Sequence, residues 1–256
     1  MFQIIKTRIQ QKYRTFKYPD GAPPELPARF AGRPVIKKSA CQDRGCDLCI
    51  ASCPVQAIQI SPETNGPVID TGKCIFCRAC ERACPDSMIS FSMEYRLAAS
   101  KRSGLSVQAG SPDYSPAGHE TAARFFKKSL KLRQVSAGGC NACEADTNVL
   151  GTLAWDLGRF GIQFVASPRH ADGILITGPV TENMREALLK TYRAVPDPKV
   201  VIVVGSCAIS GGPYEGHPEQ NNGADGILHV DLYIPGCPPH PLTILDGLLR
   251  FTGRIV

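Results

Sequence analysis

The sequence predicts an α/β protein of two domains, in which a small cysteine-rich domain precedes an open parallel sheet covered by helices. Three observations support this prediction. Eight of the 12 cysteines in the 256-residue chain fall between residues 41 and 84. A segment rich in Ser, Gly, Ala and Pro follows at 97–130. From about residue 131, short apolar runs alternate with helical patterns, which is typical of open α/β sheets.

Residues 1–35 are predicted to form an arm that begins with a short amphipathic helix and continues as an extended Pro- and Gly-rich chain. The sequence has no apolar run of signal-peptide length and nothing near the roughly 20 apolar residues of a membrane span. We therefore expect neither export by such a signal nor a membrane crossing. The arm interleaves basic and apolar side chains and predicts a membrane-proximal surface, made of Lys6, Arg8, Lys12, Arg14 and Lys17 with Ile4, Ile5, Ile9, Tyr13 and Phe16.

The formal net charge of the chain is +6. A basic balance permits nucleic acid or an anionic membrane as a partner. The charge does not gather into one long block, so we expect no nucleic-acid partner; the simplest interpretation is a solvated basic face. In a reducing compartment, such dense cysteine predicts metal ligation before disulfides.

Residues 36–96 are predicted to form a domain built on an internal repeat of cysteines. The run Cys74–Pro85 has the spacing C-x2-C-x2-C-x3-C-P of bacterial ferredoxins, in which three thiolates hold one [4Fe-4S] cube and the fourth ligates another cluster. The run Cys41–Pro54 repeats it with a first interval two residues longer. The copies are offset by 31 residues, the separation of Cys53 and Cys84. We expect a bacterial-type 2×[4Fe-4S] ferredoxin domain whose clusters replace a hydrophobic core.

Exchange of the fourth cysteine between the two runs defines the expected ligand sets. The first cluster takes Cys41, Cys46, Cys49 and Cys84. The second takes Cys53, Cys74, Cys77 and Cys80. Thiolates suit zinc as well as iron–sulfur cubes. Zinc sites usually pair distant C-x2-C knuckles, however, so the interleaved runs favour iron–sulfur over zinc and over disulfides.

Residues 97–130 are predicted to be a linker, and 131–256 a flavodoxin-like domain with an open parallel sheet. Its buried strands are expected at 162–165, 173–177, 200–204 and 231–234, with a helix at 181–193. Because crossovers between parallel strands are right-handed, the loops after the strands should share one edge of the sheet.

The four remaining cysteines each lie beside a predicted strand end or a glycine-rich turn; they are Cys140, Cys143, Cys207 and Cys237. Open parallel sheets bind ligands outside the carboxyl ends of their strands. Taken singly, Cys207 and Cys237 fit ordinary buried cysteines equally well. Four cysteines at one sheet edge, with every other cysteine assigned, favour a third [4Fe-4S] cluster.

Both parts of the chain carry motifs of known protein families. Those of the C-terminal part are Gly139-Cys140-Asn141-Ala142-Cys143-Glu144, Ser167-Pro168-Arg169-His170-Ala171-Asp172, Gly205-Ser206-Cys207-Ala208 and Pro235-Gly236-Cys237-Pro238-Pro239. Those of the N-terminal part are Phe30-Ala31-Gly32-Arg33-Pro34 and Gly72-Lys73-Cys74. Through the first group, residues 131–256 resemble the small subunit of energy-converting, membrane-bound [NiFe] hydrogenases of the formate hydrogenlyase and hydrogenase-4 type, and the related 20 kDa cluster subunit of complex I. Through the second, residues 1–97 resemble the ferredoxin subunit of formate hydrogenlyase-type complexes, which is normally a separate polypeptide.

The resemblance implies an electron-transfer subunit that relays electrons through three [4Fe-4S] clusters to or from the Ni–Fe site of a partner large subunit. We find no sequence signature of a nickel site, a nucleotide-binding loop or a nucleophile–base pair, so no catalytic residue is assigned. Further implied partners are membrane subunits and a donor such as formate dehydrogenase or ferredoxin, and the implied location is peripheral, on the cytoplasmic face of the inner membrane. The alternative is the cluster subunit of a complex I-like NADH/ferredoxin:quinone oxidoreductase. Those subunits carry two adjacent cysteines where this chain has Cys140-x2-Cys143, which favours the hydrogenase branch.

Three further residues are candidates for tuning the third cluster. Arg169 and His170 follow a predicted strand and are expected at the same edge as Cys207, where a cation raises a cluster's potential. An ordinary interface salt bridge is the alternative role for Arg169. Glu144 is expected to hydrogen-bond near the cluster or the partner, or to be simply an acid at a helix N-terminus.

Overall fold

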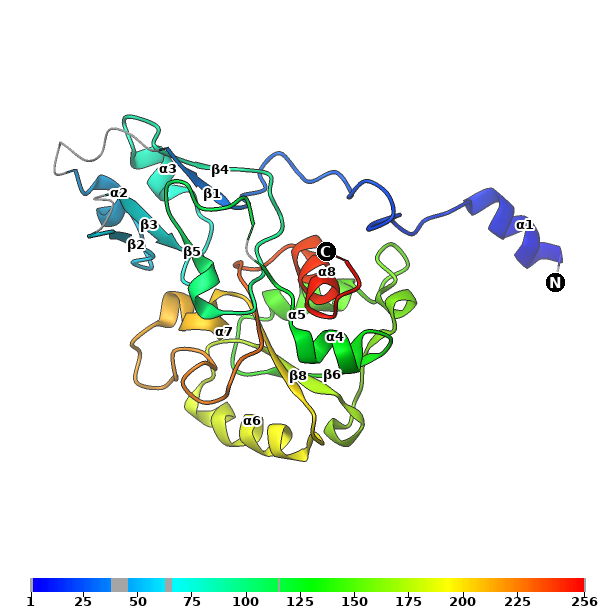
Figure 1. Ribbon diagram of the computed structural model, residues 1–256. Helices are drawn as coiled ribbons and strands as arrows, with labels where there is room; N and C mark the ends of the chain where they lie inside the picture. The colour runs from blue at the N-terminus through cyan, green and yellow to red at the C-terminus, as the bar shows by residue number, and fades with distance from the viewer. Residues whose placement is uncertain (1, 38–45, 63–65, 115, 256) are drawn as a thin grey trace.

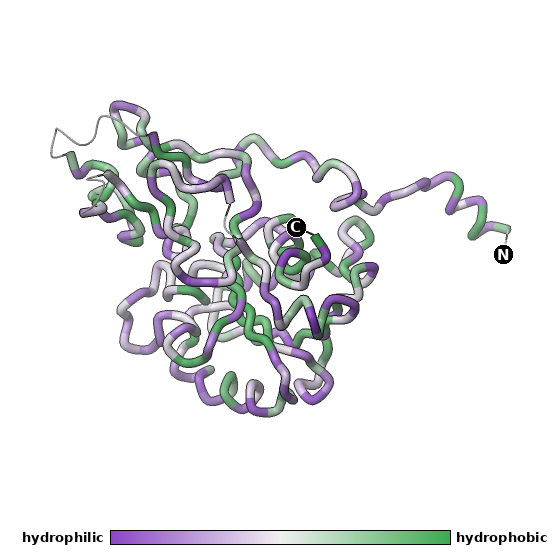
Figure 2. The backbone as a smooth tube through the Cα atoms, in the orientation of Figure 1, coloured by the Kyte–Doolittle hydropathy of each residue, from purple (hydrophilic) through white to green (hydrophobic). Residues whose placement is uncertain are grey.

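The computed structural model describes residues 2–37, 46–62, 66–114 and 116–255 (Figure 1). A small cysteine-rich domain packs against a larger α/β domain, and the N-terminal helix stands apart from both. Figure 2 shows hydrophobic residues concentrated along the central strands of the larger domain, with hydrophilic residues more frequent around its outside. The predicted fold class is confirmed.

The internal repeat of the cysteine-rich domain is visible in its elements. Helices α2 (Leu48–Ala51) and α3 (Ala79–Ala83) begin 31 residues apart, as do strands β2 (Ile58–Ile60) and β4 (Ile89–Phe91). Strand β4 pairs antiparallel with β1 (Pro34–Ile36), and β2 pairs antiparallel with β3 (Pro67–Asp70). The small core consists of apolar residues from these strands and of the cysteines themselves, including Ile36, Ile58, Ile69, Ile89, Cys49, Cys74 and Cys80.

The larger domain is built on five parallel strands in the order β10-β9-β8-β6-β7. They are β6 (Leu130–Ser136), β7 (Ile162–Phe164), β8 (Gly173–Thr177), β9 (Val200–Val204) and β10 (Leu232–Ile234). Every residue of β8 and β9 is buried, because helices cover both faces of a parallel sheet. Four of these strands are predicted from the sequence. Strand β6 is not, because polar residues interrupt its apolar pattern.

Helices cover the two faces of this sheet in separate groups. On one face α4 (Glu120–Phe126), α5 (Ala142–Val149) and α8 (Pro241–Phe251) lie over residues such as Leu132, Leu175 and Ile202. On the other face α6 (Glu182–Ala194) and α7 (Ser206–Ser210) lie over Ile174, Val201 and Val203. Neighbouring strand residues therefore alternate between two hydrophobic cores.

Residues 97–130, predicted to be a linker, connect the domains and pack on both. The segment contains the 3-10 helix η1 (Arg102–Leu105), strand β5 (Ser106–Val107) and helix α4. Strand β5 pairs with β3 in the small domain, and Ala99 forms a bridge with Tyr233 of β10. Tertiary contacts order a segment whose Ser, Gly, Ala and Pro content carries no periodic pattern.

The N-terminal arm begins with the expected helix, α1 (Phe2–Gln11). It then runs along the α/β domain, where Phe16 N donates to Ala154 O at 2.8 Å and the Tyr18 hydroxyl donates to Asp246 Oδ1 at 2.6 Å. The arm reaches the small domain at Gly32, whose N–H donates to Ser92 O. None of the described helices is both long and apolar enough to span a bilayer.

Candidate metal centres

The structure brings together the four cysteines expected to hold the second cluster. Cys53, from the first run, lines one small cavity with Cys74, Cys77 and Cys80 of the second run. The rest of the wall is mainly apolar and includes Ile58, Ile69, Ile75 and Phe91. The crossing of Cys53 into the other run's group is the arrangement that exchange of fourth ligands requires.

Burial makes this cavity a poor environment for free thiolates. It raises the pKa of Cys74 to about 12 and that of Cys80 to about 11, and the neighbouring thiols oppose ionisation further. A metal ligand must be a thiolate, so positive charge from bound iron has to compensate for the desolvation. The four cysteines as donor set and the mainly apolar wall around them fit an iron–sulfur cube.

Main-chain N–H groups point at the cysteine sulfurs. Ala57 N lies 3.2 Å from Cys53 Sγ, and Met88 N lies 3.3 Å from Cys84 Sγ. Each fourth cysteine thus accepts a hydrogen bond from the residue four positions later, in both copies of the repeat. Hydrogen bonds to cluster sulfurs stabilise the more negative, reduced state and raise its potential.

The ligand set expected for the first cluster is described only in part. Cys41 lies outside the described residues. Cys49 is buried, whereas Cys46 and Cys84 are half-buried. Cys49 lies close enough to Cys80 to raise the pKa of that thiol, so the two groups of cysteines are neighbours.

The third group of cysteines assembles at the carboxyl edge of the parallel sheet. Cys140 follows β6, Cys143 lies in the first turn of α5, Cys207 lies in the first turn of α7 and Cys237 follows β10. Burial strongly raises the pKa of Cys143, with further contributions from the Cys207, Cys237 and Cys140 thiols. The Cys140 and Cys237 residues are exposed, and the other two are half-buried.

Two C-x2-C knuckles, one in each domain, share the same backbone geometry. Arg78 (φ 59°) follows Cys77 and Asn141 (φ 69°) follows Cys140, both in the left-handed region. A helix begins immediately after each, so that Cys80 and Cys143 fall in its first turn. The Cys140 knuckle thus has the same local shape as the ferredoxin-type one, which supports an equivalent role.

Glycines bring the main chain close to the third group of thiols. A Cβ on Gly205 (φ +92°) would lie 2.4 Å from Cys143 Sγ, and one on Gly212 (φ +56°) would lie 3.0 Å from Cys207 Sγ. Such a close cradle, together with four thiols as the donor set, fits a [4Fe-4S] cluster. Among the described residues, no group of three or more His, Cys, Asp or Glu is placed to hold a single metal ion. A cube differs because its four thiolates bind four separate iron atoms.

Glu144 joins this edge of the sheet to α5. It is 6% exposed, and its Oε1 accepts hydrogen bonds of 2.6 Å from Ser136 Oγ and from Thr177 Oγ1. These hydroxyls end β6 and β8, so the carboxylate fixes the first turn of α5, which carries Cys143, against two strands. A tuning role toward a cluster stays a prediction.

Arg169 and His170 lie in the short 3-10 helix η3 (Pro168–His170), outside the buried core. Two residues later, the Asp172 side chain accepts a hydrogen bond from Lys131 N near the start of β6. The loop has thus returned toward the amino edge of the sheet. The structure does not describe a contact of either residue with the third group of cysteines, and their predicted role stays untested.

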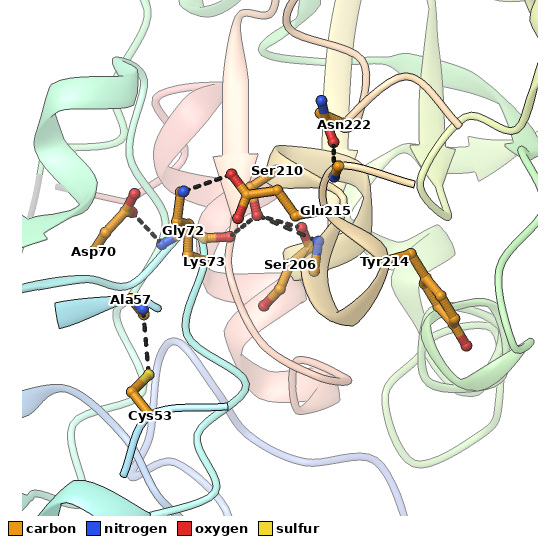
Figure 3. A network of polar contacts seen from close by, with 12 residues as sticks. Cys53, Ala57, Asp70, Gly72, Lys73, Ser206, Ser210, Tyr214, Glu215 and Asn222 are labelled. Carbon is orange, nitrogen blue, oxygen red and sulfur yellow. Dashed lines mark hydrogen bonds and ion pairs between the residues drawn. The ribbon is translucent and has the colours of Figure 1, made fainter. Parts of the chain in front are cut away.

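Polar contacts that the sequence does not predict hold the two domains together (Figure 3). The buried Ser206 Oγ donates to Cys74 O at 2.6 Å and lies 3.1 Å from Gly236 O. Ser210 Oγ lies 3.2 Å from Gly72 O, and Lys73 Nζ pairs with Glu215 Oε1 at 2.5 Å. Short Ser side chains on α7 therefore join the second and third groups of cysteines.

Comparison with known proteins assigns both domains. Residues 140–251 match the family described as the 20 kDa subunit of NADH ubiquinone oxidoreductase, and residues 40–88 match the 4Fe-4S dicluster domain. The dicluster match confirms that the cysteine-rich domain holds [4Fe-4S] clusters. A total of three clusters in the whole chain, with the third in the α/β domain, stays a prediction.

Individual relatives come from two kinds of complex. A probable membrane-bound hydrogenase subunit (mbhJ) of Pyrococcus furiosus is 40% identical over 126 residues, which are 49% of this chain and 75% of that protein. Formate hydrogenlyase subunit 7 of Escherichia coli is 43% identical over 130 residues, 51% of each chain. An NADH-quinone oxidoreductase subunit of Bacteroides thetaiotaomicron is 41% identical over 116 residues, 45% of this chain and 59% of that one.

Proposed function

Since the chain belongs to the family of the 20 kDa subunit of NADH ubiquinone oxidoreductase and also carries a 4Fe-4S dicluster domain, we propose that it is the electron-transfer subunit of a membrane-associated [NiFe] hydrogenase complex. Its relatives include a membrane-bound hydrogenase subunit and a formate hydrogenlyase subunit. Because the latter aligns over only half of its own length, the activity of the whole complex belongs to the proposal.

The relay consists of three [4Fe-4S] clusters, each of which, when bound, accepts and releases single electrons. The ligand sets are Cys41, Cys46, Cys49 and Cys84; Cys53, Cys74, Cys77 and Cys80; and Cys140, Cys143, Cys207 and Cys237. Cys49 of the first set lies near Cys80 of the second in the small domain, and the third set lies on the carboxyl edge of the sheet. All 12 cysteines of the chain are used.

One observation supports electron transfer between the two domains: the hydroxyl of Ser206 bridges segments that carry cysteines of the second and third sets. It contacts the carbonyl of Cys74, in the second set, and its own chain neighbour is Cys207, in the third set. Gly236 O, which lies beside Cys237, also accepts from Ser206 N at 2.9 Å. At this point of the interface, residues that flank the two sets are in direct contact.

The partner large subunit, which carries the Ni–Fe centre, docks on the carboxyl edge of the sheet. The exposure of Cys140 and Cys237 there supports this position, since the shell around a metal site controls its access to water and its potential, and a partner would complete that shell. The electron donor, such as formate dehydrogenase or another ferredoxin, docks on the cysteine-rich domain. Membrane subunits complete the complex, and the chain is peripheral on the cytoplasmic face.

A second candidate is the cluster subunit of a complex I-like NADH/ferredoxin:quinone oxidoreductase. The 41% identity with a subunit of an NADH-quinone oxidoreductase favours it. The separated pair Cys140-x2-Cys143 favours the hydrogenase instead, because complex I subunits resemble this chain but have adjacent cysteines there.

Anaerobic purification of the chain with its native partners tests the proposal. We expect about 12 iron atoms per chain with matching sulfide, from three four-iron cubes, a nickel-containing partner, and hydrogen evolution from a reduced viologen dye. A matched Cys207→Ser variant should lose about 4 iron atoms. It should also lose the hydrogen evolution that is driven by the electron donor of the complex. Zinc without sulfide, or a complex that reduces quinone and holds no nickel, would overturn the assignment.

A further inference from the structure

Helix α1 is the one described α-helix in which no residue is buried. Figure 1 shows it standing clear of both domains at the end of the arm. Its large apolar side chains face solvent, with Ile4 75% and Ile9 71% exposed. A helix that exposes isoleucines and stands clear of its own chain needs another surface to cover it.

The apolar residues of α1 form a stripe. Phe2, Ile5 and Ile9 are spaced by three and four residues, so they lie on one face of the helix. At 100° per residue, Lys6 and Arg8 lie on opposite flanks of that stripe. Long basic side chains in these positions cover apolar surface with their stems and hold their charges at the level of lipid headgroups. Ile4 falls outside the stripe, on the polar side.

The charged residues in the first part of the arm are all positive. Residues 1–19 contain five Lys or Arg and no Asp or Glu. A surface that combines an apolar stripe with unopposed positive charge complements anionic lipid, since headgroup charge and acyl chains are then met together.

The arm presents α1 from a fixed point on the α/β domain. Lys12 (φ 55°) is left-handed and ends the helix. Three residues later Thr15 Oγ1 donates to Leu153 O at 2.9 Å. Leu153 is itself exposed, so the anchor adds an apolar side chain near the helix. The helix is thus tied to one side of the α/β domain through a short connection.

We propose that α1 is an interfacial helix that lies in the headgroup layer of an anionic membrane and holds the chain at that surface. The inference rests on the proposed membrane association of the complex and names the segment and the lipid chemistry that provide it.

Vesicle flotation of the purified, cluster-loaded full chain tests this inference. We expect the chain to float with phosphatidylcholine vesicles that contain phosphatidylglycerol, to stay behind with pure phosphatidylcholine, and to be released by high salt. Ile9→Gln should lower vesicle partitioning about tenfold. Ile4→Gln is the matched control, because Ile4 has the same side chain and nearly the same exposure but lies outside the stripe. Paired Lys6→Gln and Arg8→Gln changes should weaken the preference for anionic lipid.

Equal partitioning of wild type and Ile9→Gln on anionic vesicles would overturn the inference. If Ile9→Gln then also lost partner subunits from the detergent-solubilised complex, α1 would be assigned to a protein contact instead. Neither readout uses hydrogen evolution or nickel, so a failure of the proposed hydrogenase function remains distinguishable.

Discussion

The Ser206 hydroxyl donates a 2.6 Å hydrogen bond to the main-chain carbonyl of Cys74, across the boundary between the two domains. Both partners are buried. Ser206 immediately precedes Cys207. A path of covalent bonds and this one hydrogen bond therefore connects Cys74 of the second set to Cys207 of the third. A path made of covalent bonds and one short hydrogen bond also keeps the two groups at a fixed separation.

Replacement of Ser206 by Ala should slow electron exchange between the second and third clusters. The change leaves the Cys74 carbonyl without this donor, which costs about 1–3 kcal/mol for a buried group and loosens the interface. Exchange can be followed by rapid-freeze electron paramagnetic resonance after reduction through the donor. Ser210→Ala is the control, because Ser210 contacts Gly72, which is not next to a cysteine ligand. Equal exchange rates in the two variants would contradict the proposed role.

Gly205→Ala should remove the third cluster while leaving the other two. The added Cβ would lie 2.4 Å from Cys143 Sγ, closer than real contacts allow. Iron analysis should fall from about 12 to about 8 atoms per chain, because one four-iron cube is lost. Gly216→Ala is the matched control: its φ is also positive, at +80°, but nothing lies within 4 Å of the added Cβ. A full iron content in Gly205→Ala would mean that the cradle is not a cluster site.

Cys53→Ser should perturb the same cluster as Cys77→Ser, although the two residues belong to different runs. Both line one cavity with Cys74 and Cys80. Redox titration monitored by electron paramagnetic resonance distinguishes the signals of the clusters. The Cys46→Ser variant shows which signal belongs to the first cluster. If Cys53→Ser matched Cys46→Ser instead, each run would hold its own cluster and the exchange of fourth ligands would be wrong.

Cysteine spacing was sufficient to predict the repeat and the crossing of Cys53 because ligand geometry fixes the intervals in a short chain. The buried strands β8 and β9 were equally predictable from unbroken apolar runs. Strand β6 was not, since Lys131, Arg133 and Gln134 interrupt its apolar pattern. The contacts of Ser206 and Glu144 also escaped prediction, because they depend on which distant main-chain and hydroxyl groups the fold brings beside them.

Tyr18→Phe should destabilise the α/β domain by about 1–3 kcal/mol, because it removes a hydrogen bond to a buried carboxylate. The Tyr18 hydroxyl holds Asp246 Oδ1 at 2.6 Å and fastens the arm to α8, with Arg250 Nε on the same carboxylate at 3.1 Å. Burial raises the pKa of Asp246, while the Tyr18 hydrogen bond and Arg250 act to lower it. Loss of the hydroxyl should raise that pKa further.

The sign of the pH dependence follows from this shift. A carboxyl whose pKa is higher in the folded state than its unfolded value near 3.9 contributes most to stability below that value, and the contribution falls as pH rises through the folded pKa. The penalty of Tyr18→Phe should therefore be larger at pH 8 than at pH 5, measured as the difference in apparent melting temperature from wild type under anaerobic conditions. Tyr13→Phe is the control: the Tyr13 side chain is 83% exposed, so this change should leave the apparent melting temperature unaltered at both pH values. A penalty that is equal at both pH values would show that the hydroxyl does not act through the charge of Asp246.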